Sequence, residues 1–258
     1  MTPDPPADPP ADPVSNDGET TPTPTPAGII VIDKARGFTS MDVCAIVRGK
    51  LKRAGAPKRI KVGHGGTLDP MATGVLVVMV GNATKMCEAV MVGEKEYEAT
   101  IDLSRTSDTD DAEGVIREVE VVTKPDEAKV TVALMTFVGE IDQVPPAFSA
   151  LHVGGRRAYD LAREGKAVEM PARRVVIHEI RLERYAWPEV VVRVRCGKGV
   201  YIRSLARDLG RVLGAGGMLT ALRRTRVGRW SLSGARTIPD LPGMLVQADL
   251  AAFADLGL

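Results

Sequence analysis

Residues 63–76 read GHGGTLDPMATGVL, a glycine-rich stretch that runs straight into an apolar segment. Glycine has no side chain, so this backbone can approach a bulky ligand closely. Asp69 precedes Pro70, which restricts the backbone here, and the mainly branched aliphatic run at residues 75–81 predicts a buried strand. A carboxylate on a loop anchored in this way is well placed to act as a nucleophile.

Other interpretations of this loop stay open from the residues alone. An aspartate before a proline also often caps a turn, and a lone histidine such as His64 is more often a turn or core residue than a functional one. Phosphate binding is disfavoured because no lysine follows the last glycine, as a P-loop requires, and because Leu68 stands where a dinucleotide fingerprint needs glycine. The chain's three scattered histidines predict neither a catalytic triad nor a metal site.

The segments around the loop alternate between strand and helix patterns. Residues 28–34 predict a buried strand, and residues 40–53 predict a helix with Ser40 as its N-cap. Further strands are expected at 75–81, 97–103, 114–122, 174–185 and 189–197, helices at 126–138, 157–165 and 201–214, and an irregular segment at 143–155. Strands outnumber helices and follow one another as hairpins, which favours an α+β fold with a mixed, mainly antiparallel sheet flanked by helices.

The last of these helices carries apolar residues at helical spacing. We expect four of them to face the core: Leu205, Leu209, Val212 and Leu213.

Composition and charge divide the chain unevenly. Residues 1–27 hold nine of the 18 prolines and five acidic residues without any Lys or Arg, which predicts a disordered tail. Residues 156–229 hold 18 Lys and Arg against seven Asp and Glu, an excess that attracts a polyanion such as nucleic acid. Solvated faces of strands and helices would explain the same count.

Several protein classes are disfavoured by the composition. No run of about 18 apolar residues and no signal-like N-terminus is present, so we expect a cytoplasmic protein that does not span a membrane. Cys44, Cys87 and Cys196 lie far apart, which argues against disulfides or a zinc site and predicts buried free thiols. No extended apolar surface stripe indicates more than a monomer.

Several motifs resemble those of the tRNA pseudouridine synthase B family, whose members isomerise a uridine in the T-loop of tRNA. Residues 63–76 match every fixed position of the pattern G-H-x-G-x-L-D-P-x-A-x-G-x-L around the family's catalytic aspartate. Other segments similar to the family follow in order: IDKARGFTS (32–40), NATK (82–85), KEYEA (95–99), TSDTDDAEG (106–114), PPAFSALHVGGRRAYDLAREG (145–165), CGKGVYIRSLARDLG (196–210) and LRRTRVG (222–228).

The resemblance implies roles for individual residues. Asp69 would be the catalytic carboxylate, Arg203 its ion-pair partner, and Tyr97 the ring that stacks on the target base. Three further residues would line the substrate pocket: His64, Tyr201 and Leu222. The implied reaction isomerises the uridine at tRNA position 55 to pseudouridine. The nucleotide gains no atom, and the reaction needs no cofactor or metal. The implied partner is the T-arm of tRNA, without an obligate protein partner.

The resemblance also implies a domain organisation. A pseudouridine synthase-like catalytic domain would span residues 28–230, followed by a short segment, 231–258, that is too short for the RNA-binding domain of many bacterial members. The chain departs from the family pattern at Ala35, where a proline is common, and at His152, where a lysine is common. The alternative function is a tRNA-binding or RNA-folding module that keeps this fold without depending on catalysis.

Overall fold

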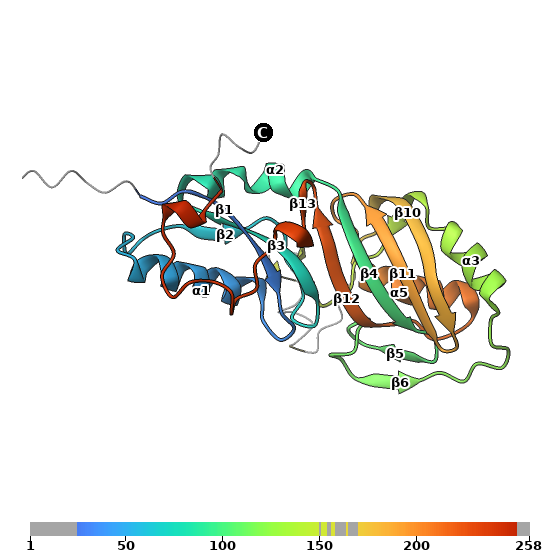
Figure 1. The fold of residues 1–258 in the computed structure, drawn as a ribbon. Coiled ribbons are helices and arrows are strands. Elements are labelled where there is room, and N and C mark those ends of the chain that lie inside the picture. Colours follow the sequence, from blue (N-terminus) through green and yellow to red (C-terminus); the bar gives the residue numbers. More distant parts are fainter. Residues whose placement is uncertain (1–24, 150, 154–155, 158–163, 165–169, 252–258) are drawn as a thin grey trace, which may run out of the picture.

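The computed structural model describes residues 25–149, 151–153, 156–157, 164 and 170–251. Its main feature is a nine-stranded sheet in the order β1-β3-β12-β4-β11-β10-β7, with β2 beside β3 and β13 beside β12 (Figure 1). Strand pairs in this sheet are antiparallel except for β3 with β12. The expected α+β fold with a mixed, mainly antiparallel sheet is therefore confirmed.

The sheet consists of β1 (Gly28–Lys34), β2 (Val62–His64), β3 (Thr73–Val80), β4 (Lys95–Asp102), β7 (Gly139–Gln143), β10 (Arg173–Ala186), β11 (Glu189–Cys196), β12 (Met218–Val227) and β13 (Trp230–Ser231). The helices are α1 (Ser40–Arg53), α2 (Cys87–Val92), α3 (Glu127–Met135) and α5 (Ile202–Leu213), with short 3-10 helices η1 (Gly81–Met86), η2 (Leu232–Gly234) and η3 (Gln247–Asp249). Two small hairpins are β5 (Arg105–Ser107) with β6 (Ile116–Glu118), and β8 (His152–Val153) with β9 (Arg156–Arg157).

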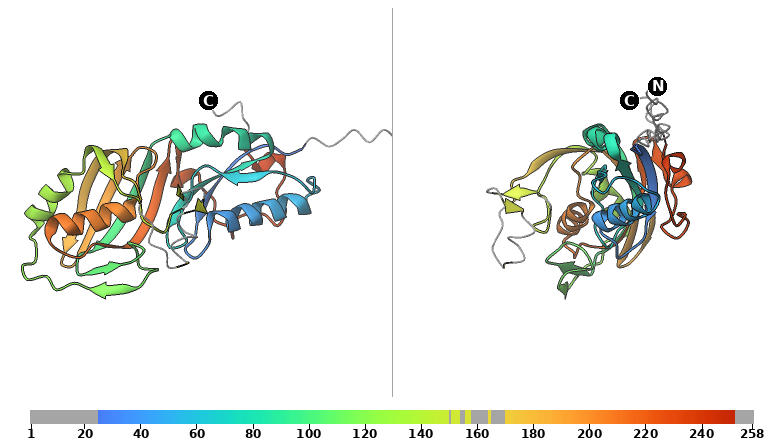
Figure 2. Two further views of the ribbon diagram at one scale, coloured as in Figure 1. Left: turned by 180° about the vertical axis from the view of Figure 1, so that it is seen from behind. Right: turned by 90° about the vertical axis from the view of Figure 1, so that its left-hand side faces the viewer.

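Strand β3 is buried on both faces, which explains its continuous apolar sequence. Leu76 and Val78 pack in the same core as α1, whereas Val75 and Val77 pack with residues of η1 and α2 on the opposite face. Helices α3 and α5 contact the sheet further along, and Figure 2 shows them on the face opposite to the open face of β4, β11 and β10 in Figure 1. The part of the sheet with β4, β11 and β10 therefore has a covered inner face and a solvent-facing outer face.

The cap of α1 differs from the expectation by one residue. Thr39 is the N-cap: its Oγ1 accepts from the N–H of Asp42 at 3.0 Å, and Asp42 Oδ2 accepts from the N–H of Thr39 at 2.8 Å. Ser40 is instead buried, and its hydroxyl bonds the backbone of Leu68 in the glycine-rich loop, accepting at 2.9 Å and donating at 3.2 Å. Ser40 therefore ties α1 to the loop that carries Asp69.

Strand β12 was not predicted, although it lies between β3 and β4 in the middle of the sheet. Its sequence, MLTALRRTRV, carries three arginines and has no clear apolar alternation. The structure buries one of them, Arg224, to 2% exposure. Strand β7 was also missed, and the strand expected at 114–122 is shortened to β6. The predicted helix at 157–165 lies outside the described residues except for Arg157, which is in β9, and Glu164, which is in a turn.

Two expectations about burial were wrong in detail. Val212 of α5 is 56% exposed, whereas Leu205 and Leu209 are fully buried and Leu213 packs against the core. Cys87 is only partly buried, unlike the other two cysteines. Its position at the start of α2 leaves the thiol beside the carbonyl of His64, to which it donates at 3.4 Å.

The sheet opens between β3 and β12. These strands pair in parallel only at Thr73 with Arg223 and Gly74 with Arg224, and beyond that point β2 pairs with β3 and β13 pairs with β12. Gly74 has φ +103°, and a Cβ there would lie 2.1 Å from the carbonyl oxygen of Arg224, so only glycine fits this close approach. The loop with Asp69 connects β2 to β3 at this opening.

Residues after β13 return to the first half of the sheet. The N–H and carbonyl of Ala251 bond those of Ile29, and Arg236 bonds Val31 and Asp33 through its backbone, so this segment covers the outer edge of β1. Lys50 of α1 donates to the carbonyl oxygens of Leu241 and Pro242 at 3.2 and 2.7 Å. The domain boundary at residue 230 stays a prediction.

Candidate active site

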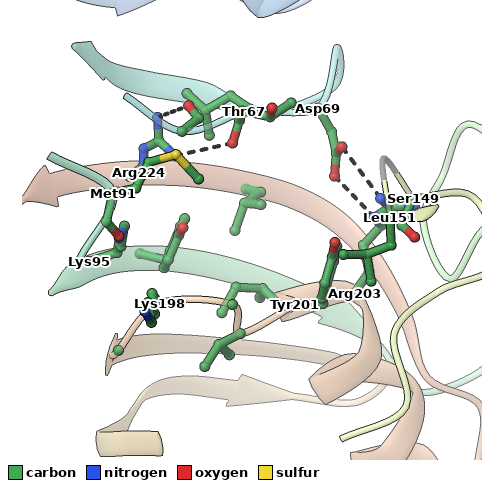
Figure 3. A pocket seen from close by; sticks show the side chains of 18 of the residues that line it. Thr67, Asp69, Met91, Lys95, Ser149, Leu151, Lys198, Tyr201, Arg203 and Arg224 are labelled. Atoms are coloured by element: carbon green, nitrogen blue, oxygen red, sulfur yellow. Dashed lines mark hydrogen bonds and ion pairs between the residues drawn. The ribbon is translucent and has the colours of Figure 1, made fainter. Parts of the chain in front are cut away.

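A pocket of about 480 Å³ opens on the inner face of β4 and β12, at the point where α5 begins (Figure 3). It contains five of the six predicted site residues: Asp69, Tyr97, Tyr201, Arg203 and Leu222. The rest of its lining comes from the loop at Gly66–Leu68, from β4, α2, β12 and α5, from the turn Gly197–Val200, and from Phe148, Ser149 and Leu151. Segments that are far apart in the sequence thus form one cavity.

Asp69 and Arg203 form an ion pair along one side of the guanidinium. Nε of Arg203 lies 3.0 Å from Oδ2 of Asp69, and Nη2 donates to Oδ1 at 3.4 Å. The Arg203 side chain is 6% exposed, whereas that of Asp69 is 32% exposed. The cation is therefore buried while the carboxylate keeps access to the pocket.

The buried guanidinium of Arg203 has further partners. It donates to the carbonyl oxygens of Thr109 at 3.1 Å and Phe148 at 3.0 Å, and Nη1 lies 3.6 Å from Oδ2 of Asp111. Asp111 is itself fixed, because its Oδ1 accepts from the Thr109 hydroxyl at 2.6 Å. Such contacts compensate the cost of burying a charge.

The sequence analysis did not identify Asp111, in the segment 106–114, as a support of the site. The structure brings this turn against α5, where Arg207 also pairs with Asp110 at 2.8 Å. The only available signal was the similarity of TSDTDDAEG to the family segment, because nothing local in the sequence indicates where the turn packs.

Three buried side chains hold the loop with Asp69 through its backbone. Arg224 donates to the carbonyl oxygens of Gly66 at 3.1 Å and Thr67 at 3.2 Å, and Ser40 bonds Leu68. Lys34 donates to the carbonyl oxygen of Pro70 at 3.3 Å. Burial lowers the pKa of Lys34 from 10.5 to about 8.

The two predicted tyrosines enter the pocket from different elements. Tyr97, on the inner face of β4, is 9% exposed, and burial raises the pKa of its phenol. Tyr201 is the N-cap residue of α5. Its N–H donates to Oε1 of Gln143 at 2.8 Å and its carbonyl oxygen accepts from Nε2 at 3.1 Å, so one buried amide fixes the start of the helix. Burial also raises the pKa of Tyr201, and the nearby Ser149 hydroxyl and Arg203 offset part of that effect.

The structure does not place His64 in the lining of this pocket. His64 ends β2, opposite Val78 of β3, and its Nδ1 is buried without a hydrogen-bond partner among the residues described. Burial and, to a smaller extent, the charge of Arg224 lower the pKa of His64, which favours a neutral imidazole. The five other predicted residues line one cavity, and His64 is not among the residues that line it.

The pocket also has a cationic end that sequence reasoning did not identify. Lys95 and Lys198 lie together there, away from Asp69 (Figure 3). Lys95 is 7% exposed and donates to the carbonyl oxygens of Met91 and Gly93, the latter at 2.6 Å, at the end of α2. Lys198 is exposed on the turn after β11. The pocket therefore has a carboxylate at one end and ammonium groups at the other.

Much of the positive charge counted in residues 156–229 lies elsewhere and is neutralised. On the outer face of the sheet Arg193 pairs with Glu98 at 3.0 Å, and Arg195 pairs with Glu94 at 3.3 Å. Further outer-face pairs join Arg181 to Glu179, Arg184 to Glu189 and Arg226 to Glu96. The excess along the sequence therefore does not map onto a single uncompensated surface.

The arrangement suits carboxylate chemistry on a flat ring. Asp69 is accessible, an adjacent guanidinium pairs with its carboxylate, and an aromatic face lies in the same cavity. A carboxylate so placed can act as a nucleophile or as a base. Within the described part of the chain, no group of three His, Cys, Asp or Glu side chains is arranged to hold a metal ion. No helix there is long and apolar enough to cross a membrane.

Comparison with protein families identifies two matching regions. Residues 52–202 match the N-terminal domain of the TruB family of pseudouridylate synthases, and residues 203–252 match the tRNA pseudouridylate synthase B C-terminal domain. The boundary falls at the start of α5, inside the pocket. Because β12 of the second region lies between β3 and β4 of the first, both regions build one sheet.

Curated relatives agree with this match. The chain is 47% identical over 232 residues to tRNA pseudouridine synthase B of Thermobifida fusca (strain YX), which covers 87% of this chain and 77% of the relative. It is 48% identical over 222 residues to the protein of the same name in Mycobacterium tuberculosis (strain ATCC 25618 / H37Rv), with 84% and 72% covered.

Solved structures show the same fold. A chain of a Cbf5-Nop10-Gar1 complex matches with a TM-score of 0.63 and 31% identity, over 83% of this chain and 53% of that one. A chain of an H/ACA RNP bound to a substrate RNA containing 2'-deoxyuridine matches with a TM-score of 0.60 and 29% identity, over 83% and 52%. The chain spans about half the length of these solved relatives. From the family match, the identity to curated relatives and the shared fold, we conclude that the chain belongs to the TruB family of pseudouridylate synthases, enzymes that isomerise uridine in tRNA.

Proposed function

We propose that this protein isomerises the T-loop uridine of tRNA to pseudouridine, with Asp69 as the catalytic carboxylate. The observation that carries the proposal is the accessible Asp69 carboxylate, paired with buried Arg203 in a cavity that also holds Tyr97. The names of the curated relatives support tRNA as the substrate. The T-loop position rests on the similarity of residues 63–76 to the family motif.

The reaction exchanges one bond of the nucleotide for another. The bond between N1 of uracil and C1′ of the ribose breaks, and a bond between C5 and C1′ forms. C5 loses its proton, and N1 gains one, so atoms and electrons balance without an oxidant or a cofactor. Asp69 supplies the carboxylate that starts this exchange, and the ion pair with Arg203 orients it.

The target base has to leave its stack to reach Asp69. Unstacking costs a few kcal/mol, and stacking on an aromatic side chain returns about 1–3 kcal/mol per base. Tyr97 provides such a face in our proposal, and Leu222 of the neighbouring β12 provides an apolar contact. A tyrosine phenol is neutral at physiological pH, and burial raises the pKa of Tyr97 further, so its ring can pack against an uncharged base.

We propose that the tRNA backbone is held by cations around the pocket mouth rather than by the outer face of the sheet. Lys198 is exposed at the mouth, whereas the outer-face arginines are paired with glutamates. Phosphate contacts of this kind position a nucleic acid without reading its sequence. We further propose that the protein acts as a monomer in the cytoplasm and needs no protein partner.

The test is release of tritium from tRNA that is labelled at C5 of uridine, with the modified position mapped in the product. We expect Asp69→Asn to fold and bind tRNA but to release no tritium, because the amide is neither a nucleophile nor a base. Asp126→Asn is the matched control, since Asp126 caps α3 at the surface and asparagine caps equally well. Normal turnover by Asp69→Asn would refute the role of Asp69.

The same assay distinguishes the proposed enzyme from the alternative function, a tRNA-binding or RNA-folding module. A wild-type protein that binds tRNA but releases no tritium would indicate an RNA-binding or RNA-folding module. Release that maps outside the T-loop would refute the proposed target while keeping the enzyme class.

A further inference from the structure

Ser149 is a buried hydroxyl at the catalytic end of the pocket that lacks a hydrogen-bond partner. It is 4% exposed, yet it is part of the pocket lining. Figure 3 shows it beside the ion pair of Asp69 and Arg203. Its Oγ has no hydrogen-bond partner among the residues that the structure describes. Buried hydroxyls in proteins are nearly always bonded, so this one requires an explanation.

Other buried serines near the site are satisfied. The hydroxyl of Ser40 bonds the backbone of Leu68, and that of Ser204 donates to the carbonyl oxygen of Val144 at 2.8 Å. The hydroxyl of Ser149 lies close enough to Tyr201 to lower the pKa of its phenol. Ser149 Oγ nevertheless has no partner at hydrogen-bond geometry among the described residues. Leaving a buried hydroxyl without a hydrogen bond is unfavourable, and a ligand in the pocket would remove that cost.

The position of Ser149 indicates which part of a nucleotide it meets. Tyr97 pairs with Arg224 across β4 and β12, so the face proposed for the base lies on the sheet side of the pocket. Ser149 follows Phe148, whose carbonyl oxygen is held by Arg203 on the α5 side. In the proposed reaction the bond between base and sugar breaks at the Asp69 end of the pocket. A base stacked on Tyr97 would have its ribose at that end, where Figure 3 shows Ser149.

We propose that the hydroxyl of Ser149 hydrogen-bonds the ribose 2′-hydroxyl of the target nucleotide, an inference that rests on the proposed function. A 2′-hydroxyl both donates and accepts, as does serine, so the pair satisfies both groups. This hydroxyl is also the group by which a protein distinguishes RNA from DNA. Ser149 is thus a specificity-determining contact for ribose at the reacting nucleotide.

The thermal stability of Ser149→Ala distinguishes a substrate-binding role of Ser149 from a structural one. If Ser149 awaits a ligand, Ser149→Ala removes an unsatisfied hydroxyl, and its Tm in the absence of RNA should equal or exceed that of the wild type. Ser204→Ala is the matched control, because it deletes a buried serine hydroxyl that does have a partner. We expect the Tm of that control to fall by about 2–4 °C. A similar fall for Ser149→Ala would overturn the proposal.

A double-mutant cycle then identifies the partner group. Single-turnover pseudouridine formation is measured for the wild type and Ser149→Ala on synthetic T-arm stem-loops with either uridine or 2′-deoxyuridine at the target position. We expect Ser149→Ala to lower kcat/KM on the uridine substrate by about 3- to 10-fold. It should have little effect on the 2′-deoxyuridine substrate, because the partner is already absent. A direct effect of the 2′-hydroxyl on the reaction is the same in the wild type and in Ser149→Ala. It therefore cancels when the ratio of the rates on the two substrates is compared between the two proteins.

Each other result overturns the assignment. Equal losses on both substrates would mean that Ser149 contacts the base or a phosphate, and no loss on either would mean that it does not contact the substrate. The wild type on the uridine stem-loop is measured first. Absence of pseudouridine there would refute the proposed function itself, which keeps the two failures distinct.

Discussion

The guanidinium of Arg203 contacts groups from three segments outside its own helix: Asp69, the turn with Thr109 and Asp111, and the carbonyl of Phe148. A planar fork with five donors can serve all of them at once, whereas the lysine ammonium is a compact group with three. The carboxylate of Asp69 therefore depends for its orientation on a residue 134 positions later in the chain.

We expect Arg203→Lys to reduce the single-turnover rate on the order of 100-fold while changing tRNA affinity little, because two or more charge-assisted contacts are lost at the reacting carboxylate. Rate and affinity are measured separately on the same tRNA. Arg193→Lys on the outer face is the matched control, since Arg193 also pairs with carboxylates but lies away from the pocket. Equal losses in rate and affinity would mean that Arg203 is mainly a phosphate contact.

At the scale of elements, the loop between β2 and β3 is held by side chains from β1, α1 and β12. Lys34, Ser40 and Arg224 all bond its backbone rather than its side chains. Such contacts fix the path of the loop and leave the Asp69 side chain directed toward Arg203 and the pocket. Gly66 of this loop has φ +123°, a backbone conformation that residues with a side chain rarely adopt.

The stability that Lys34 contributes by holding this loop depends on pH. Its pKa is about 8 in the folded protein against 10.5 ordinarily, so between these values the unfolded chain binds more protons than the folded one. Stability conferred by Lys34 therefore rises with pH across this window. We expect the free energy of unfolding of the wild type minus that of Lys34→Met to increase from pH 8 to 10.5, by no more than about 1.4 kcal/mol per pH unit.

Urea denaturation at several pH values measures this difference. Lys58→Met is the matched control for loss of one amine, because Lys58 is exposed in the turn after α1. A constant difference for Lys34→Met across the window would contradict the prediction and indicate that the ammonium stays charged.

At the scale of the whole molecule, residues 236–251 complete the first half of the fold. Leu241, Leu245 and Leu250 are buried in the main core, and their segment covers the edge of β1 that would otherwise be unpaired. Figure 1 shows this stretch around α1 and β1, away from the strands that line the pocket. Its expected role is stability rather than chemistry.

We expect Leu245→Ala to lower the free energy of unfolding by about 2–5 kcal/mol, because it leaves a cavity in a fully buried position. Its turnover at a temperature where it is fully folded should match the wild type. Val246→Ala is the matched control, since the neighbouring side chain is 49% exposed. Slower turnover by folded Leu245→Ala would show that this segment is coupled to the pocket.

Local patterns predicted a large part of the fold. Apolar runs and helical spacing indicated β1, α1 and β3, because these signals depend only on neighbouring residues and on which face they bury. The same signals missed β12, because its three arginines interrupt the alternation of apolar and polar residues that marks a strand. They also assigned Val212 to the wrong face of α5. A charged residue can fill a buried position only if distant groups compensate it, and no local pattern records those groups.

The sequence by itself determined which residue types the chemistry has available: an aspartate on a glycine-rich loop, an arginine that begins a helix, and a tyrosine on a strand. Only the tertiary structure decided which of them meet, placing Asp69, Tyr97 and Arg203 in one pocket and His64 outside it. It also paired the outer-face arginines with glutamates and left the Ser149 hydroxyl unbonded. The physical reason is that charge compensation and burial depend on strand register and helix docking, which join residues that are far apart along the chain.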